Sequence, residues 1–179
     1  ILLSPTFMDA LFHSYRPRNP GTSFPIKCFP VEKTQYSHLP TNENPYARNL
    51  DIGGNYRLFF INDNFHYLEG ETFWTVGDKE LEMLLLAPKK VKRLTAVLHN
   101  NRIKNRVRFQ VEHQSKRLGI GPEMTKTLDF EKIPGLKVAR GYLYHIKVKS
   151  SRAYCPFFAE ENNEDKRWLG INVRIILKY

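Results

Sequence analysis

The sequence predicts an all-β protein, and two observations lead to that prediction. The first is a strict alternation of apolar and polar residues in several runs, clearest in 105–112, 141–150 and 170–178. Successive side chains of a strand point to opposite faces, so this pattern indicates strands with one buried and one solvated face. The second is that short turn sequences separate such runs from residue 56 onward. Many short strands at close intervals are typical of a β-sandwich or a barrel.

Residues 1–50 differ from the rest of the chain in composition and residue pattern. A short apolar start, where we expect most of the helix, ends in the sequence Arg16-Pro-Arg-Asn-Pro-Gly21. Prolines remove a backbone donor and fix a backbone angle, so a helix cannot continue through this sequence. Four further prolines follow before residue 46. This spacing favours an extended N-terminal arm that wraps along the body of the protein.

From residue 51 to residue 179 the sequence predicts a single antiparallel β-sandwich of jelly-roll type. Its alternating runs and turn residues divide it into nine expected strands: 56–61, 65–68, 72–76, 80–87, 91–99, 105–112, 123–130, 141–150 and 167–177. The sequence Gly119-Ile-Gly121-Pro122 is interpreted as a turn, because glycine and proline interrupt strands. The predicted core consists of the apolar positions of three runs: Val107, Phe109, Val111, Tyr144, Ile146, Val148, Ile171, Val173 and Ile175.

Positive charge is concentrated between residues 88 and 118. This segment contains ten Lys or Arg residues and one acid, so it carries +9 of the chain's formal net charge of +10. Such a field attracts polyanions, including nucleic acid and acidic glycans. The candidate polyanion-binding residues are Lys89, Lys90, Lys92, Arg93, Arg102 and Lys104. The alternative is that these cations cover the solvated faces of strands, where they also prevent edge-to-edge pairing.

The two cysteines, Cys28 and Cys155, leave two interpretations open. They can form one disulfide that joins the arm to the sandwich if the compartment is oxidising. They can also be two free thiols, buried as small hydrophobic side chains. Two sulfurs without a C-x-x-C spacing do not form a zinc site, so no metal and no cofactor is predicted. The acids and amides of 62–71 still leave room for a structural calcium ion.

No catalytic motif is present in the sequence. It lacks a G-x-S-x-G elbow, a P-loop and a dinucleotide-binding glycine pattern, and its six histidines form no ligand set. A protein without catalysis is therefore predicted, and an enzyme is the third hypothesis after two binding functions.

The tryptophans are the stronger functional signal. Trp74 and Trp168 both lie near predicted strand ends or turns, and each has polar neighbours in the sequence. The faces of sugar rings stack on tryptophan while nearby polar groups bind the hydroxyls. Trp74 and Trp168, with Arg106 and Arg167, are therefore the candidate ligand-binding residues. The alternative is that each tryptophan closes one end of the sandwich core.

A series of short motifs carries a resemblance to a known class of protein. In chain order the motifs are Phe73-Trp-Thr-Val-Gly77, Glu82-Met-Leu-Leu-Leu-Ala-Pro88, Leu94-Thr-Ala-Val-Leu98, Asn105-Arg-Val-Arg-Phe109, Tyr144-His-Ile-Lys-Val-Lys-Ser-Ser151 and Arg167-Trp-Leu-Gly-Ile-Asn-Val173. Over about residues 56–177 the chain resembles the soluble C-terminal β-sandwich of bacterial multi-spanning membrane glycosyltransferase-like proteins. That region has the look of a carbohydrate-binding module, and the resemblance brings no catalytic residue with it.

The resemblance implies an accessory module at the periplasmic or extracellular face of a bacterial envelope. Its expected partner is a glycan or a larger membrane assembly, and we expect the chain to be a piece of a longer protein. The rival hypothesis is a module that binds nucleic acid or another anionic polymer through the basic surface of 88–118. The sequence does not predict an oligomeric state.

Overall fold

The computed structural model describes residues 47–62 and 65–179, which form two antiparallel sheets. Sheet A contains β1 (Asn49–Ile52), β2 (Tyr56–Phe60), β5 (Glu80–Ala87), β7 (Asn105–Val111), β8 (Gln114–Ile120), β10 (Leu136–Val138) and β11 (Gly141–Ser150). Sheet B contains β3 (His66–Glu69), β4 (Thr72–Val76), β6 (Arg93–Asn100), β9 (Thr125–Glu131) and β12 (Leu169–Lys178). A four-residue helix, α2 (Pro156–Ala159), lies between β11 and β12.

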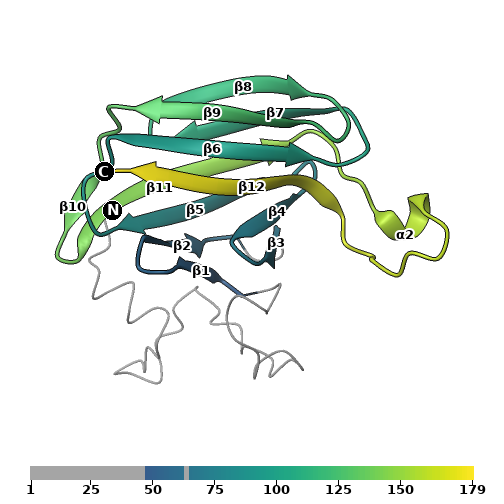
Figure 1. Cartoon of the computed structure of the whole chain (residues 1–179), viewed down its shortest axis with the longest axis horizontal. Coiled ribbons are helices and arrows are strands. Elements are labelled where there is room, and N and C mark those ends of the chain that lie inside the picture. The colour runs from purple at the N-terminus through teal and green to yellow at the C-terminus, as the bar shows by residue number, and fades with distance from the viewer. Residues whose placement is uncertain (1–46, 63–64) are drawn as a thin grey trace, which may run out of the picture. The chain divides into compact units, whose positions relative to one another are not determined.

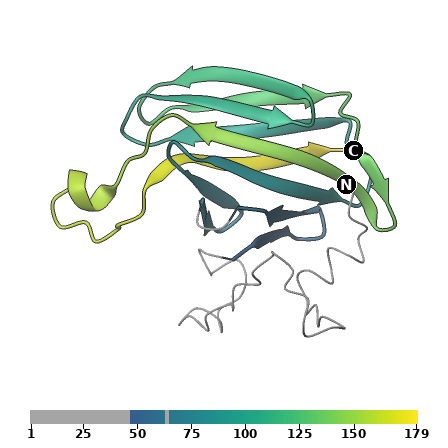
Figure 2. The same cartoon turned by 180° about the vertical axis from the view of Figure 1, so that it is seen from behind.

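The two sheets pack face to face, with sheet B nearer the viewer in Figure 1 and sheet A nearer in Figure 2. The strand order is β1-β2-β5-β11-β7-β8 in sheet A, with β10 beside β11, and β3-β4-β12-β6-β9 in sheet B. The chain passes from one sheet to the other at most of its turns, as it does in jelly rolls. The predicted all-β sandwich is therefore confirmed.

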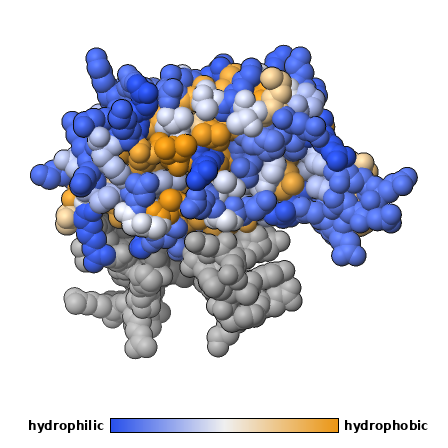
Figure 3. Space-filling model, viewed as in Figure 1, coloured by the Kyte–Doolittle hydropathy of each residue, from blue (hydrophilic) through white to orange (hydrophobic). Residues whose placement is uncertain are grey.

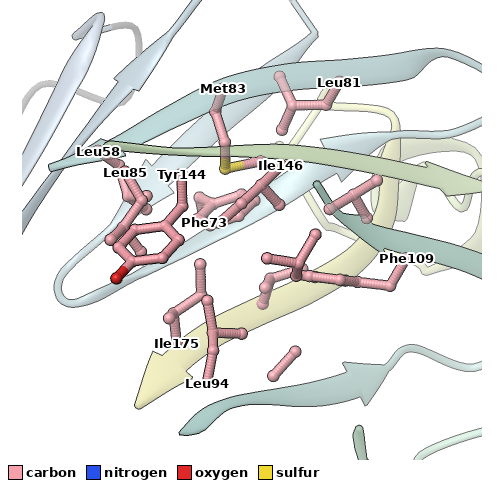
Figure 4. Close-up of a cluster of buried hydrophobic side chains, with 14 of the residues drawn as sticks. Leu58, Phe73, Leu81, Met83, Leu85, Leu94, Phe109, Tyr144, Ile146 and Ile175 are labelled. Carbon is pink, nitrogen blue, oxygen red and sulfur yellow. The ribbon is translucent and has the colours of Figure 1, made fainter. Parts of the chain in front are cut away.

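The core fills the space between the sheets. Figure 4 shows side chains from both sheets meeting there, among them Phe73 from β4, Phe109 from β7 and Ile146 from β11. All nine residues predicted for the core are buried, with at most 3% of each residue exposed. The alternation identified them because each strand presents every second side chain to the facing sheet.

Polar bonds also join the two sheets inside this core. The Tyr56 hydroxyl on β2 donates to the carbonyl of Ile175 on β12 at 2.7 Å, and burial raises the pKa of that phenol. The hydroxyls of Thr75 on β4 and Ser150 on β11 lie 3.1 Å apart. A buried hydroxyl with a partner contributes about 1 kcal/mol, whereas one without a partner costs about 1–3 kcal/mol. These bonds therefore help to fix how the sheets pack.

Three strands were not predicted, and each has a physical reason. β1 forms a hairpin with β2 through a tight turn in which Gly53 and Gly54 have positive φ angles of 49° and 75°. β10 is only three residues long. β8 is an edge strand whose inward positions include Gln114 and Lys116, so its sequence shows no alternation of apolar and polar residues. Gly119 and Ile120 belong to β8, so the predicted turn at Gly119 is wrong and the chain leaves the strand only at Gly121.

The expectation for helix can be checked only in part. The first fifteen residues lie outside the described residues, and the described part contains α2 at Pro156–Ala159, where no helix was expected. A proline at the first helical position suits a helix start, because its missing N–H needs no partner there.

Candidate functional site

The outer face of sheet B carries a row of five side chains, one from each strand. Strand pairing places them side by side in the order Tyr67, Trp74, Asn172, His99 and Thr125. The row runs from β3 through β4, β12 and β6 to β9, and hence crosses the whole sheet. The residues directly before and after Trp74 on β4 and Asn172 on β12, such as Phe73 and Val173, are buried. Because side chains alternate along a strand, the members of this Trp74 row point outward.

The aromatic end of the Trp74 row is held by hydrogen bonds and charge. The indole N–H of Trp74 donates to a carboxylate oxygen of Glu69 at 2.6 Å. The guanidinium of Arg167 lies 5.7 Å from the centre of the Tyr67 ring, within cation–π range. Arg167 is positioned by Asp165, to which it donates from Nε at 2.9 Å and from a terminal nitrogen at 2.7 Å. The Arg167 hydrogen bonds lower the pKa of the Asp165 carboxyl, so the pair is charged at neutral pH.

The polar end of the row offers hydrogen-bonding groups to solvent. Asn172 uses its side-chain N–H to bond the Thr72 hydroxyl at 2.9 Å, which leaves its carbonyl oxygen without a partner among the described residues. His99 and Thr125 are both exposed, and Nδ1 of His99 lies 3.1 Å from the Thr125 hydroxyl. The row therefore combines ring faces at one end with amide, imidazole and hydroxyl groups at the other.

The rest of this face carries little net charge. Arg174 pairs with Glu71 on one side of the row, and Arg93 pairs with Glu131 farther along the sheet. Figure 3 shows mostly hydrophilic residues on this side of the molecule, with an apolar band along the middle. Ile176, at an outward position of β12, is half-exposed. A surface with paired charges and outward-facing, half-buried rings suits an uncharged ligand better than a polyanion.

A second aromatic group lies on the segment between β11 and β12. Figure 1 shows α2 and its flanking loops projecting beyond the ends of the sheets. Trp168 is 50% exposed and packs against Phe158, which is 74% exposed, with 5.9 Å between the ring centres. Phe157 lies against Phe158 in turn, and the ammonium group of Lys166 lies over its ring. Neither tryptophan closes an end of the core: Trp168 is on this projecting segment, and Trp74 faces outward from its sheet.

The structure brings together two of the four predicted ligand-binding residues, Trp74 and Arg167. Trp74 and Arg167 both contact Glu69. Trp168 follows Arg167 in the chain but packs against Phe158 on the projecting segment. Arg106 lies elsewhere, on β7, whose outward residues belong to the opposite face of the sandwich. That these residues bind a ligand stays a prediction.

The six candidate polyanion-binding residues do not form one surface. Lys89, Lys90 and Lys92 lie in the turn before β6, whereas Arg102 and Lys104 lie in the turn after it. The eight residues of β6 separate these groups by roughly 23 Å. Arg93 lies on β6 itself, as part of the ion pair already described. Whether either group binds a polyanion stays a prediction.

Cys155 is buried, and its thiol is not bonded to another sulfur among the described residues. Its predicted partner Cys28 lies outside the described residues, so the pairing stays a prediction. Asp63 and Asn64 of the proposed calcium loop lie outside them as well. Within residues 47–62 and 65–179, no three His, Cys, Asp or Glu side chains are arranged to hold a metal ion. No helix in these ranges has the length and apolarity needed to cross a membrane.

Sequence reasoning missed the polar partners of Trp74. Asn172, His99 and Thr125 come from strands separated by 26 to 73 positions in the chain, and only the strand register brings them into line with the tryptophan. The alternation places His99 and Asn172 on outward faces, which is the only local signal for them. Alternation does not reveal which strands are neighbours.

Comparisons with known proteins find distant structural likeness. No family model matches the chain, and no curated protein sequence matches it. Among solved structures, the chain resembles part of a family GH115 4-O-methyl-α-glucuronidase with specificity for decorated arabinogalactans, at 8% identity and a TM-score of 0.36. This match covers 62% of the chain and 14% of the length of the glucuronidase. The chain also resembles TmCBM61, solved in complex with β-1,4-galactotriose, at 9% identity and a TM-score of 0.30 over 73% of this chain and 88% of that one.

Proposed function

We propose that the protein is a non-catalytic module that binds an uncharged glycan chain along the Trp74 row. The observation that carries the proposal is the register of the row, which aligns ring faces with hydrogen-bonding groups across all five strands of sheet B. Neighbouring strands lie about 4.8 Å apart, so the row is roughly 19 Å long. That length accommodates a short stretch of a linear polysaccharide.

The chemistry of the row matches the two surfaces of a sugar. The C–H faces of a pyranose pack on an aromatic ring, and its hydroxyls need donors and acceptors. Trp74 supplies the ring, and its bond to Glu69 fixes the orientation of the indole before a ligand arrives. Asn172 supplies a polar group next to it, and His99 supplies another one strand farther along the row. A preorganised ring loses little freedom on binding, which favours affinity.

The proposal includes the accessory role and the envelope location predicted from the sequence. The outward row offers recognition groups on an open sheet face. A module of this kind holds a glycan for a larger assembly, as the resemblance to membrane glycosyltransferase-like proteins implies. An oxidised Cys28–Cys155 pair would support an oxidising compartment. Thiol titration of the unreduced, denatured protein tests that pair, since two titratable thiols would count against the envelope location.

Affinity electrophoresis tests glycan binding directly. Gels that contain a neutral β-1,4-galactan, a xylan or a mixed-linkage glucan should retard the wild-type protein in at least one case. Trp74→Ala should weaken that binding by about tenfold or more, which corresponds to about 1.4 kcal/mol. His99→Ala changes an exposed side chain and should weaken binding without altering the thermal midpoint.

The matched control is Trp168→Ala, which removes the same ring from the projecting segment. If Trp168→Ala abolishes retardation and Trp74→Ala does not, the glycan binds at the loop and the row is not the site. Absence of retardation on every neutral polysaccharide would contradict the proposed function.

A further inference from the structure

The outer face of sheet A contains a row of cations that the strand register brings together. Lys149 on β11 lies opposite Arg108 on β7, and Arg108 lies opposite Arg117 on β8. Arg106 lies two residues from Arg108 on the same outward face of β7. Like charges directly opposite one another in a sheet destabilise the pairing of the strands. Four cations in this arrangement therefore disfavour the folded state unless anions compensate them.

The protein's own acids compensate only half of this group. Arg108 pairs with Glu80, and Lys149 lies 3.4 Å from a carboxylate oxygen of Asp78. Arg106 and Arg117 are exposed, and no acid among the described residues lies within ion-pair distance of either one. Two guanidinium groups thus remain available to an external anion.

The same residues border an open depression. The residues that line it include Arg106, Arg108, Arg117, Gly119, Lys149 and Ser151, and its volume is about 610 Å³. Gly119 lies opposite Arg106, and a β-carbon at this glycine would have open space around it. The missing side chain leaves room on the edge strand between the two unpaired arginines, so an anionic group can reach both of them.

The rim of the depression is fixed by Asn105. Its side-chain oxygen accepts from the backbone N–H of Ser151 at 3.0 Å and of Arg152 at 3.2 Å, and from the Ser151 hydroxyl at 3.1 Å. Asn105 is 1% exposed. This bonding holds the chain after β11 against the start of β7, next to Arg106, so the position of the depression's edge is set before a ligand binds.

We propose that this depression binds the sulfate or carboxylate groups of an acidic polysaccharide. Guanidinium groups form paired hydrogen bonds with planar and tetrahedral oxyanions, and such bonds are stronger than neutral ones. No aromatic ring lines the depression, so it offers no surface on which the bases of a nucleic acid could stack. Two arginines without an acid partner among the described residues are also fewer than the six to ten phosphate contacts of a strongly salt-dependent nucleic-acid surface. The site is separate from the Trp74 row and does not depend on it.

The test measures binding of the full chain to dextran sulfate, polygalacturonate, unmodified dextran and duplex DNA at the same salt concentration. Dextran sulfate and polygalacturonate distinguish sulfate from carboxylate as the recognised group, and binding of either one supports the site. Arg106→Gln combined with Arg117→Gln should weaken that binding about tenfold or more. The thermal midpoint of this double variant should not fall, because both side chains are exposed.

The matched control is Lys89→Gln combined with Lys90→Gln, which removes two charges from the turn before β6. It should retain nearly full affinity for the acidic polysaccharide. If both double variants lose affinity for the acidic polysaccharide to the same extent, the binding reflects general electrostatic attraction. That result would overturn the proposal. Binding of DNA that is tighter than that of both acidic polysaccharides would overturn it as well, as would binding of unmodified dextran that the arginine substitutions weaken.

Discussion

The two outer faces of the sandwich differ in chemistry although they are built on the same core. Sheet B presents rings, an amide and an imidazole in one row, with flanking charges paired. Sheet A presents a cluster of four cations, of which Arg106 and Arg117 have no acid partner among the described residues. Inward residues of a strand are constrained by packing, whereas outward residues are free to vary. One fold can therefore carry two unlike binding surfaces back to back.

The two faces also differ in the electrostatic repulsion among their outward side chains. On sheet B the Trp74 indole and the Arg167 guanidinium are held by Glu69 and Asp165, respectively. The indole N–H therefore already has a hydrogen-bond acceptor. On sheet A the like charges of Arg108 and Arg117 face each other across the strands. The first face is arranged without electrostatic strain, and the second gains stability when an anion binds.

The largest expected effect comes from the core that both faces share. Phe109 is fully buried on β7 and lies against Phe130 on β9, so it contacts both sheets. Phe109→Ala removes this contact and leaves a cavity, which should lower the free energy of unfolding by about 3–5 kcal/mol. Both binding activities should then be lost together as the protein is warmed. Ile176→Ala, at a half-exposed outward position, should change stability by about 0.5 kcal/mol or less.

The next effect should separate the faces. Asn105→Ala leaves the N–H group of Arg152 without its acceptor, whereas that of Ser151 keeps the carbonyl of Arg106 at 2.9 Å. The loss should cost about 1–3 kcal/mol in denaturant unfolding. Because this asparagine fixes the edge of the sheet A depression, affinity for an acidic polysaccharide should fall at temperatures where the variant remains folded. Binding of a neutral glycan to sheet B should be retained. Parallel loss of both activities in the folded variant would show that the faces are not independent.

Core and fold were accessible from the sequence, and the sites were accessible only in part. Alternation identifies Val107 and Ile146 as core positions because burial acts on every second residue of one strand. The edge strand β8 lacks alternation because polar residues also occupy inward positions near the sheet edge, and so the positions of Arg117 and Gly119 in the sheet were missed. Alignment of Trp74 with Asn172 depends on pairing between strands almost a hundred residues apart, which no local pattern encodes.

A smaller expected effect is that salt changes ligand affinity differently at the two faces. An anionic ligand that binds Arg106 and Arg117 displaces counterions, so its affinity should fall with salt, with a log–log slope of roughly one for each arginine contact. Stacking of a neutral sugar on Trp74 involves no charge, so its affinity should hardly change. Titration calorimetry between 50 and 200 mM NaCl measures both slopes, since these concentrations span the range where such dependence is strong. A steep salt dependence for the neutral glycan would place its site away from the Trp74 row.

The smallest expected effect is a change in how stability depends on pH, and it arises from Glu82 on sheet A. Partial burial raises the pKa of this carboxyl, but hydrogen bonds from Lys147 and His145 outweigh burial and lower the pKa below the ordinary value of 4.5. The ammonium group of Lys147 and Nε2 of His145 lie 3.2 Å and 2.6 Å from the same carboxylate oxygen. A carboxyl with a lowered folded-state pKa stabilises the protein above its ordinary pKa.

That contribution is lost as the pH falls through the folded-state pKa of Glu82. Because about 30% of the Glu82 side chain is exposed, solvent screens the pair and the effect should be modest. Thermal midpoints measured from pH 7 to pH 3 should therefore fall less steeply for Glu82→Gln than for the wild type. Glu161→Gln removes an exposed carboxylate that pairs with no cation among the described residues, so its curve should follow the wild type. Equal acid slopes for the wild type and Glu82→Gln would mean that the Lys147 and His145 bonds do not persist in solution, and that sheet A carries still more uncompensated positive charge.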